Sequence, residues 1–139
     1  DGKVDIKVLD LQTLQAGSPL VDLLYFIFTG SDKQFRAKYF DRLVEHYYSQ
    51  LSASMRRLHL NPDEIYSKED FDAEMKEKLP FGLSVAVFGL PMMTINPEDA
   101  PKVDENLSFE DFGVEKTNDL YIERINGAVD DFVRWGVLK

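Results

Sequence analysis

The sequence has 139 residues, 44% of them hydrophobic and 12% aromatic, so one domain over residues 1–139 with a sizeable core is expected. Its formal net charge of −9 makes nucleic acid and anionic membranes poor partners. The lack of Cys excludes disulfides and Cys-based zinc sites, which fits a reducing, cytoplasmic location. No apolar run approaches the roughly 20 residues needed to span a bilayer.

The first segment has the alternation that is typical of a strand. Residues 4–8 place apolar side chains on one face and charged ones on the other, and Leu9 and Leu11 then flank Asp10. Asp1-Gly2 is a turn dipeptide, so we expect the second arm of a hairpin whose first arm is missing. A lone strand leaves its edge unpaired, which predicts that the chain is part of a larger fold.

Two helices are expected next. Ser18 can cap and Pro19 suits a first turn, which predicts a helix over residues 19–29 ended by Gly30. This segment is apolar on nearly every side and is therefore expected to be a buried central helix. Apolar side chains at three- and four-residue steps, among them Phe35, Phe40 and Leu43, then predict a long helix over residues 33–58 with one buried stripe.

The remaining pattern completes a mostly α fold of one strand and about five helices. Ser67 is the expected cap of a helix over residues 68–79, with acidic residues in its first turn. Pro80 is expected to start a separate helix that Pro91 kinks or ends. Residues 96–113 are polar and predict a surface loop, and residues 118–135 predict the closing helix.

Asp10 is the first candidate for chemistry. It lies near the end of the predicted strand, with apolar residues on both sides. Phosphoryl transfer needs such a carboxylate to anchor the magnesium that bridges the nucleotide phosphates. From the residues alone, an Asp that merely caps a turn is the commoner case.

Asp22 is the second candidate, because it lies on the helix predicted to be buried. A buried carboxylate must be paired or hydrogen-bonded, since it is otherwise costly. We expect it to accept hydrogen bonds from a neighbouring loop and hold that loop, rather than to act as a catalytic base.

Two weaker sets follow. Apolar side chains in the last part of the fourth helical segment could line a pocket for an apolar acceptor, although ordinary core packing is the commoner outcome: Phe81, Phe88, Met92 and Met93. His46 and His59 have no carboxylates at metal-ligand spacing and are expected to be ordinary surface or core residues.

Two runs of residues resemble the signature of a known protein family. They are Val8-Leu9-Asp10-Leu11-Gln12 and Gly17-Ser18-Pro19-x-x-Asp22-Leu23-Leu24-Tyr25-Phe26. Together they resemble the ecdysteroid kinase-like branch of the choline kinase and aminoglycoside phosphotransferase superfamily. The resemblance implies a protein-kinase-like C-lobe that uses ATP and Mg²⁺ to phosphorylate a hydroxyl, with a steroid-like alcohol as the acceptor class.

The resemblance also implies residue roles. Asp10 corresponds to the magnesium-binding Asp, Gln12 lines the nucleotide site, and Asp22 braces the catalytic loop. Leu11 stands where the family more often has Phe, a departure that affects packing more than chemistry. The His-Gly-Asp catalytic loop and the Gly-rich phosphate loop are not in this sequence. They would belong to an upstream N-terminal lobe, the expected partner, without which the chain should be inactive.

Two alternatives remain open. The chain could be a non-catalytic helical module, derived from a kinase-like fold, that binds a ligand or partner. It could also be a fragment with no independent function, whose exposed strand edge and lobe interface favour aggregation.

Overall fold

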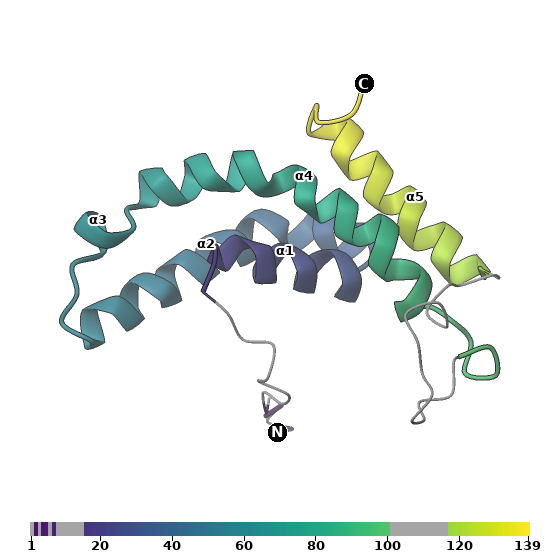
Figure 1. Cartoon of the computed structure of the whole chain (residues 1–139), viewed down its shortest axis with the longest axis horizontal. Helices are drawn as coiled ribbons and strands as arrows, with labels where there is room; N and C mark the ends of the chain where they lie inside the picture. The colour runs from purple at the N-terminus through teal and green to yellow at the C-terminus, as the bar shows by residue number, and fades with distance from the viewer. Residues whose placement is uncertain (1, 3, 6, 8–15, 101–116) are drawn as a thin grey trace.

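The computed structural model describes residues 2, 4–5, 7, 16–100 and 117–139. These residues form five helices in the order α1 (Pro19–Gly30), α2 (Lys33–Arg57), α3 (Pro62–Ile65), α4 (Lys68–Met93) and α5 (Asp119–Arg134) (Figure 1). The mostly helical fold class is therefore confirmed. The strand predicted over residues 4–11 falls mainly outside the described residues, and the described ones among them are not in a strand.

The helix starts lie where the capping residues predict them. Ser18 caps α1 and Asp32 caps α2, each by accepting a hydrogen bond from a backbone N–H of the first turn. Ser67 and Asp70 form a reciprocal capping box at the start of α4. Asn118 caps α5 by accepting from the Tyr121 N–H. Local side-chain chemistry thus determines where each long helix begins.

The prediction of two helices over residues 68–90 is wrong, because α4 runs without a break from Lys68 to Met93 and contains both Pro80 and Pro91. Pro80 cannot donate to the preceding turn, and its ring crowds that turn, so a bend rather than a break results. Figure 1 shows α4 bending near the middle of its length. Both halves are held by packing, which offsets the lost hydrogen bond.

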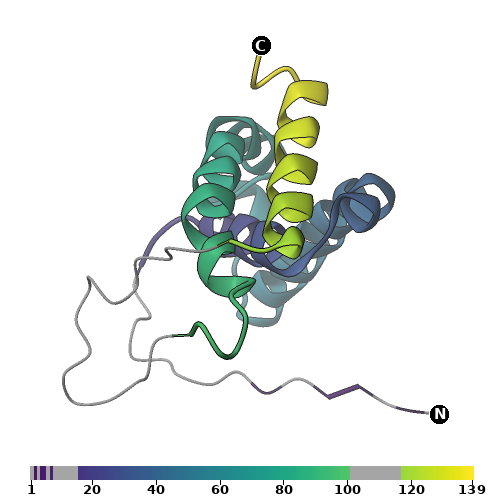
Figure 2. The same ribbon diagram turned by 90° about the vertical axis from the view of Figure 1, so that its right-hand side faces the viewer.

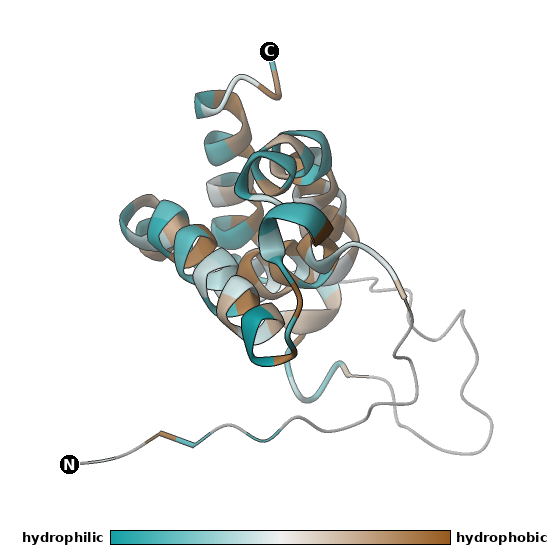
Figure 3. Ribbon diagram, turned by 90° about the vertical axis from the view of Figure 1, so that its left-hand side faces the viewer, coloured by the Kyte–Doolittle hydropathy of each residue, from teal (hydrophilic) through white to brown (hydrophobic). Residues whose placement is uncertain are grey.

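The core lies where α1 meets α4 and α5. Its fully buried side chains come from α1 (Leu20, Leu24, Phe28), α4 (Phe71, Ala86) and α5 (Ala128, Phe132). α4 and α5 lie side by side in both Figure 1 and Figure 2. α2 lies to one side of this group, and its outward face is mainly hydrophilic (Figure 3).

α1 is less enclosed than its composition predicts. Tyr25 is 45% exposed and Phe26 is 71% exposed, so one side of the helix is open to solvent. The prediction of a helix buried on every side is therefore only partly right. None of the described helices is both long enough and apolar enough to cross a membrane.

A buried ion pair joins α2 to α5. The Arg36 Nε donates to Asp131 Oδ2 at 2.7 Å, and both side chains are 1% exposed. The Arg36 Nη1 also donates to the Ser31 carbonyl at 2.6 Å, and the guanidinium lies 5.2 Å from the centre of the Phe28 ring. Arg134 completes the set by donating to Asp131 Oδ1 at 2.9 Å.

This buried pair predicts that substitutions of two neighbouring aspartates will lower the free energy of unfolding by very different amounts. Removing one partner of a buried ion pair leaves an uncompensated charge, so Asp131→Asn should lower the free energy of unfolding by about 3 kcal/mol or more. Asp130 pairs with Lys33 at the surface, where the two side chains are 59% and 51% exposed. Asp130→Asn should therefore cost less than about 1 kcal/mol. Urea unfolding measures both, and equal losses would contradict the prediction.

A second prediction concerns the contact between α1 and α4 at Gly82. A Cβ on Gly82 would lie 2.5 Å from Cε2 of Phe28, whose ring stacks on Phe132 with centroids 5.0 Å apart. Gly82→Ala should therefore lower stability by about 1–3 kcal/mol, despite the higher helix propensity of Ala.

The matched control is Gly89→Ala on the same helix, where the nearest atom, Thr29 Cγ2, lies 3.3 Å away. We expect it to be neutral or slightly stabilising, because the small adjustment needed is offset by the gain in helix propensity. Thermal unfolding compares the two variants. Similar midpoints would argue against a tight contact at Gly82.

Candidate functional site

The segment from Gly17 to Asp22 forms the capped start of α1. Ser18 has extended backbone angles, and its Oγ accepts a hydrogen bond from the Leu20 N–H at 3.2 Å. Pro19 occupies the first helical position, where its missing N–H costs nothing. The segment therefore has a local structural role: it determines where α1 begins and places Asp22 in the first turn.

Asp22 is exposed, so the prediction that it is buried is wrong. Its carboxylate lies in the first turn of α1, where the positive end of the helix dipole favours negative charge. It also lies near Tyr47, which donates to the Pro19 carbonyl at 3.4 Å. Burial, and after it the charge of Asp22, raises the pKa of Tyr47. The role of Asp22 in bracing a catalytic loop stays a prediction.

Beside the start of α1 lies a small polar group that we call the Glu74 cluster: Ser18, Tyr66 and Glu74. The Tyr66 hydroxyl donates to Glu74 Oε2, and burial, together with this contact, raises the pKa of Tyr66. Hydrogen bonds from Ser18 and from Tyr66 lower the pKa of the Glu74 carboxyl. The cluster links the cap of α1 to α4 and to the residue that follows α3.

The sequence analysis did not find the Glu74 cluster. Its three residues come from three separate segments, and no periodicity or motif connects them. The one local signal is the capping box at Ser67, which fixes the direction in which the chain enters α4 and so the position of Tyr66. Tyr48 adds a further contact by donating to the Tyr66 carbonyl at 3.1 Å.

Asp10 and Gln12, the predicted ligands of magnesium and nucleotide, lie outside the described residues. Within the described part of the chain, no three His, Cys, Asp or Glu side chains gather closely enough to hold a metal ion. Magnesium in phosphoryl-transfer sites is commonly held by one or two carboxylates together with substrate phosphates. The Asp10 carboxylate is chemically suited to that contribution.

The four side chains predicted to line an acceptor pocket lie on α4 but have different surroundings. Phe81 is half-buried and packs against the core. Phe88 is 80% exposed, Met92 38% and Met93 55%. None of the four lines either cavity described below. Phe88, Met92 and Met93 thus make up an exposed apolar surface on α4, and the role of the four residues as an acceptor pocket stays a prediction.

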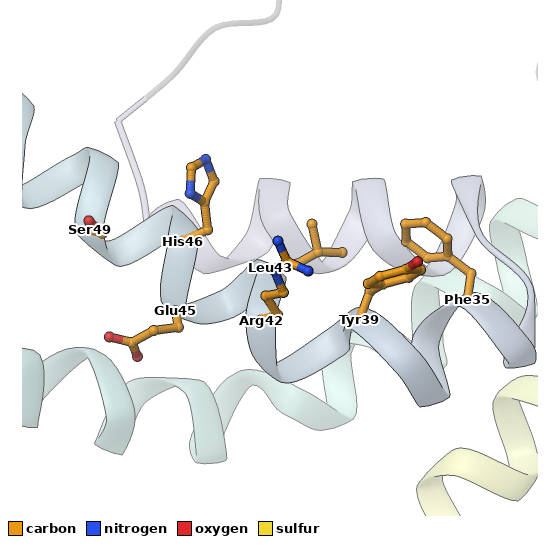
Figure 4. A pocket seen from close by; sticks show the side chains of 7 residues that line it. All are labelled: Phe35, Tyr39, Arg42, Leu43, Glu45, His46 and Ser49. Atoms are coloured by element: carbon orange, nitrogen blue, oxygen red, sulfur yellow. The ribbon is translucent and has the colours of Figure 1, made fainter.

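The larger cavity is a groove of about 780 Å³ that we call the α2 groove (Figure 4). Among the described residues, the lining side chains come from α2: Phe35, Tyr39, Arg42, Leu43, Glu45, His46 and Ser49. A smaller cavity of about 210 Å³ shares Phe35 and Leu43 with it and reaches Phe26 on α1 and Arg124 on α5. The sequence analysis missed the groove because it placed Phe35, which is 42% exposed, in a buried stripe.

Comparison with known proteins gives one match. Residues 2–60 match the model of the ecdysteroid kinase-like family, which confirms the resemblance over this part of the chain and implies a kinase-like fold. The matched range contains Asp10, Gln12, Asp22 and the whole of α2. No curated protein and no solved structure matches the chain.

The Glu74 cluster predicts a pH dependence of stability. The folded-state pKa of Glu74 is lowered from its ordinary 4.5, so the cluster stabilises the fold above that pH and loses this contribution as the pH falls through the folded-state value. Glu74→Gln should therefore destabilise the protein at pH 7 and change its stability much less near pH 3. Glu123→Gln, at an exposed position of α5 with no hydrogen bond or ion pair to a described residue, is the matched control and should change the free energy of unfolding little at pH 7. Urea unfolding at both pH values tests this.

Proposed function

We propose that the chain is the C-terminal lobe of an ATP- and Mg²⁺-dependent phosphotransferase that acts on a hydroxyl group of a small molecule. The single observation that carries the proposal is the family match over residues 2–60, which includes the Asp10 signature and the Gly17–Asp22 segment. The capped start of α1 adds support, because it shows that the second part of the signature forms a rigid element.

The proposed roles follow from the chemistry of the residues. Magnesium, when bound, neutralises the charge that develops on the phosphates. The Asp10 carboxylate would hold this ion, and Gln12 would line the nucleotide site. Asp22, exposed in the first turn of α1, is free to accept hydrogen bonds from a catalytic loop. That loop and the phosphate-binding loop would come from an N-terminal lobe of the same protein, without which the chain is inactive.

The proposed acceptor is a hydrophobic alcohol of the steroid type. The family resemblance suggests this class, and the apolar surface on α4 supports it. Phe88, Met92 and Met93 are all exposed there, and methionine side chains adapt to irregular apolar ligands. The acceptor would lie against this surface with its hydroxyl directed toward the phosphates.

A non-catalytic binding module is the second candidate, because the chain also carries the α2 groove, whose described lining side chains do not include Asp22. The two candidates differ in one measurable property. A phosphotransferase lobe contributes to magnesium-dependent nucleotide binding, whereas a binding module does not.

Titration calorimetry with Mg-ATP tests the proposal. We expect no binding by the 139-residue chain and magnesium-dependent binding by a protein that includes the proposed N-terminal lobe. Asp10→Asn in the extended protein should weaken this binding at least tenfold, because the metal loses its carboxylate ligand. Asp5→Asn is the matched control, since Asp5 lies on the charged face of the same predicted strand and should have no effect. Lack of nucleotide binding by the extended protein would favour the binding module.

A further inference from the structure

The Glu74 cluster lies at the start of the helix that carries Asp22. Ser18 caps α1 and Asp22 follows it by four residues, so the two lie one turn apart on the same face. The Ser18 Oγ accepts from the Leu20 N–H at 3.2 Å, and the Ser18 carbonyl accepts from the Val21 N–H, also at 3.2 Å. The position of Asp22 therefore depends on whether this first turn stays formed.

Tyrosine hydroxyls hold the first turn of α1 from two other parts of the fold. Tyr47 of α2 donates to the Pro19 carbonyl at 3.4 Å. Tyr66, between α3 and α4, donates to the Glu74 carboxylate, which also accepts a hydrogen bond from Ser18. Glu74 is thus the acceptor that joins Tyr66 to the cap of α1.

The polar contacts of the Glu74 cluster fix what apolar packing leaves free. α1 packs on α4 through leucine, isoleucine and phenylalanine side chains. Apolar attraction is non-directional, so it holds the two helices together without fixing how far one has slid along the other. Hydrogen bonds are directional, and satisfied polar networks favour one arrangement. The cluster therefore sets the register of α1 along α4.

We propose that Glu74 is a positioning residue of the phosphotransferase: through Ser18 and Tyr66 it holds the first turn of α1, from which the Asp22 carboxylate braces the catalytic loop. This inference rests on the proposed function. Tyr66 and Glu74 lie outside residues 2–60, the range that matches the family, so their assignment comes from their contacts. In this role Glu74 touches neither the nucleotide nor the acceptor and acts only through Asp22.

Hydrogen exchange followed by mass spectrometry tests the first turn directly in the 139-residue chain. Glu74→Ala removes the shared acceptor, so the α1 amides that follow Ser18 should exchange about tenfold faster, as expected on loss of a hydrogen bond to a charged group. This change should exceed any change in α5, because amides at a helix end exchange by local opening. Glu74→Gln keeps an acceptor oxygen and should restore part of the protection.

Catalysis supplies the second measurement, in a protein that includes the proposed N-terminal lobe. The assay is magnesium-dependent hydrolysis of ATP, in which water replaces the acceptor hydroxyl. Glu74→Ala should lower kcat about tenfold and leave KM for Mg-ATP unchanged, because the catalytic loop is misplaced while Asp10 and Gln12 are intact. In an Asp22→Asn background, Glu74→Ala should cause no further loss. Glu123→Ala, at an exposed position of α5, is the matched control and should change neither kcat nor KM.

The possible results distinguish the positioning role from the proposed function. ATP hydrolysis that Glu74→Ala leaves unchanged would overturn the positioning role and leave the proposed function intact. Full additivity of Glu74→Ala and Asp22→Asn, or exchange that is equally faster in α1 and α5, would mean that Glu74 supports only overall stability, which also overturns the role. A lack of ATP hydrolysis by the unsubstituted two-lobe protein would overturn the proposed function, and with it the role of Glu74 in catalysis, whatever the exchange in α1 shows.

Discussion

The buried pair of Arg36 and Asp131 is the constraint on which the arrangement of α2 depends. Two charges that are 1% exposed are tolerated only with close partners, and here both have them. Arg36 reaches Asp131 on α5, the Ser31 carbonyl after α1 and the ring of Phe28. Gly127 supports this contact, because a Cβ at that position would lie 2.9 Å from the Cβ of Lys33. One guanidinium thus fixes α2 relative to both α1 and α5.

The sequence predicted helix boundaries well because they depend on local chemistry. Ser18 and Ser67 each accept a hydrogen bond from a backbone group within the next turn, so the signal lies within a few residues. The prediction failed at Pro80, where the local preference is to end a helix. Packing of Phe71 on one side of the bend and of Ala86 on the other stabilises a continuous helix, and these contacts come from distant segments.

The burial of individual side chains is the part of the structure that the sequence predicted least well. Periodicity placed Phe35 in the core and gave no role to its neighbour Arg36, whereas Phe35 is 42% exposed and Arg36 is 1% exposed. The inversion follows from a partner that lies 95 residues away, Asp131, which no local pattern reveals. Asp22 shows the reverse case, since it is surrounded by apolar sequence neighbours and still lies at the surface. The α2 groove results from the same inversion, because the exposed Phe35 forms part of its wall.

α1 connects the Glu74 cluster to the buried pair of Arg36 and Asp131. Its first turn carries Asp22 and contacts the Glu74 cluster, and its last turns carry Phe28 and lead to the Ser31 carbonyl that Arg36 binds. The helix has 12 residues and is therefore about 18 Å long. Its core-facing side chains are fully buried at both ends, so α1 moves as a rigid body or not at all.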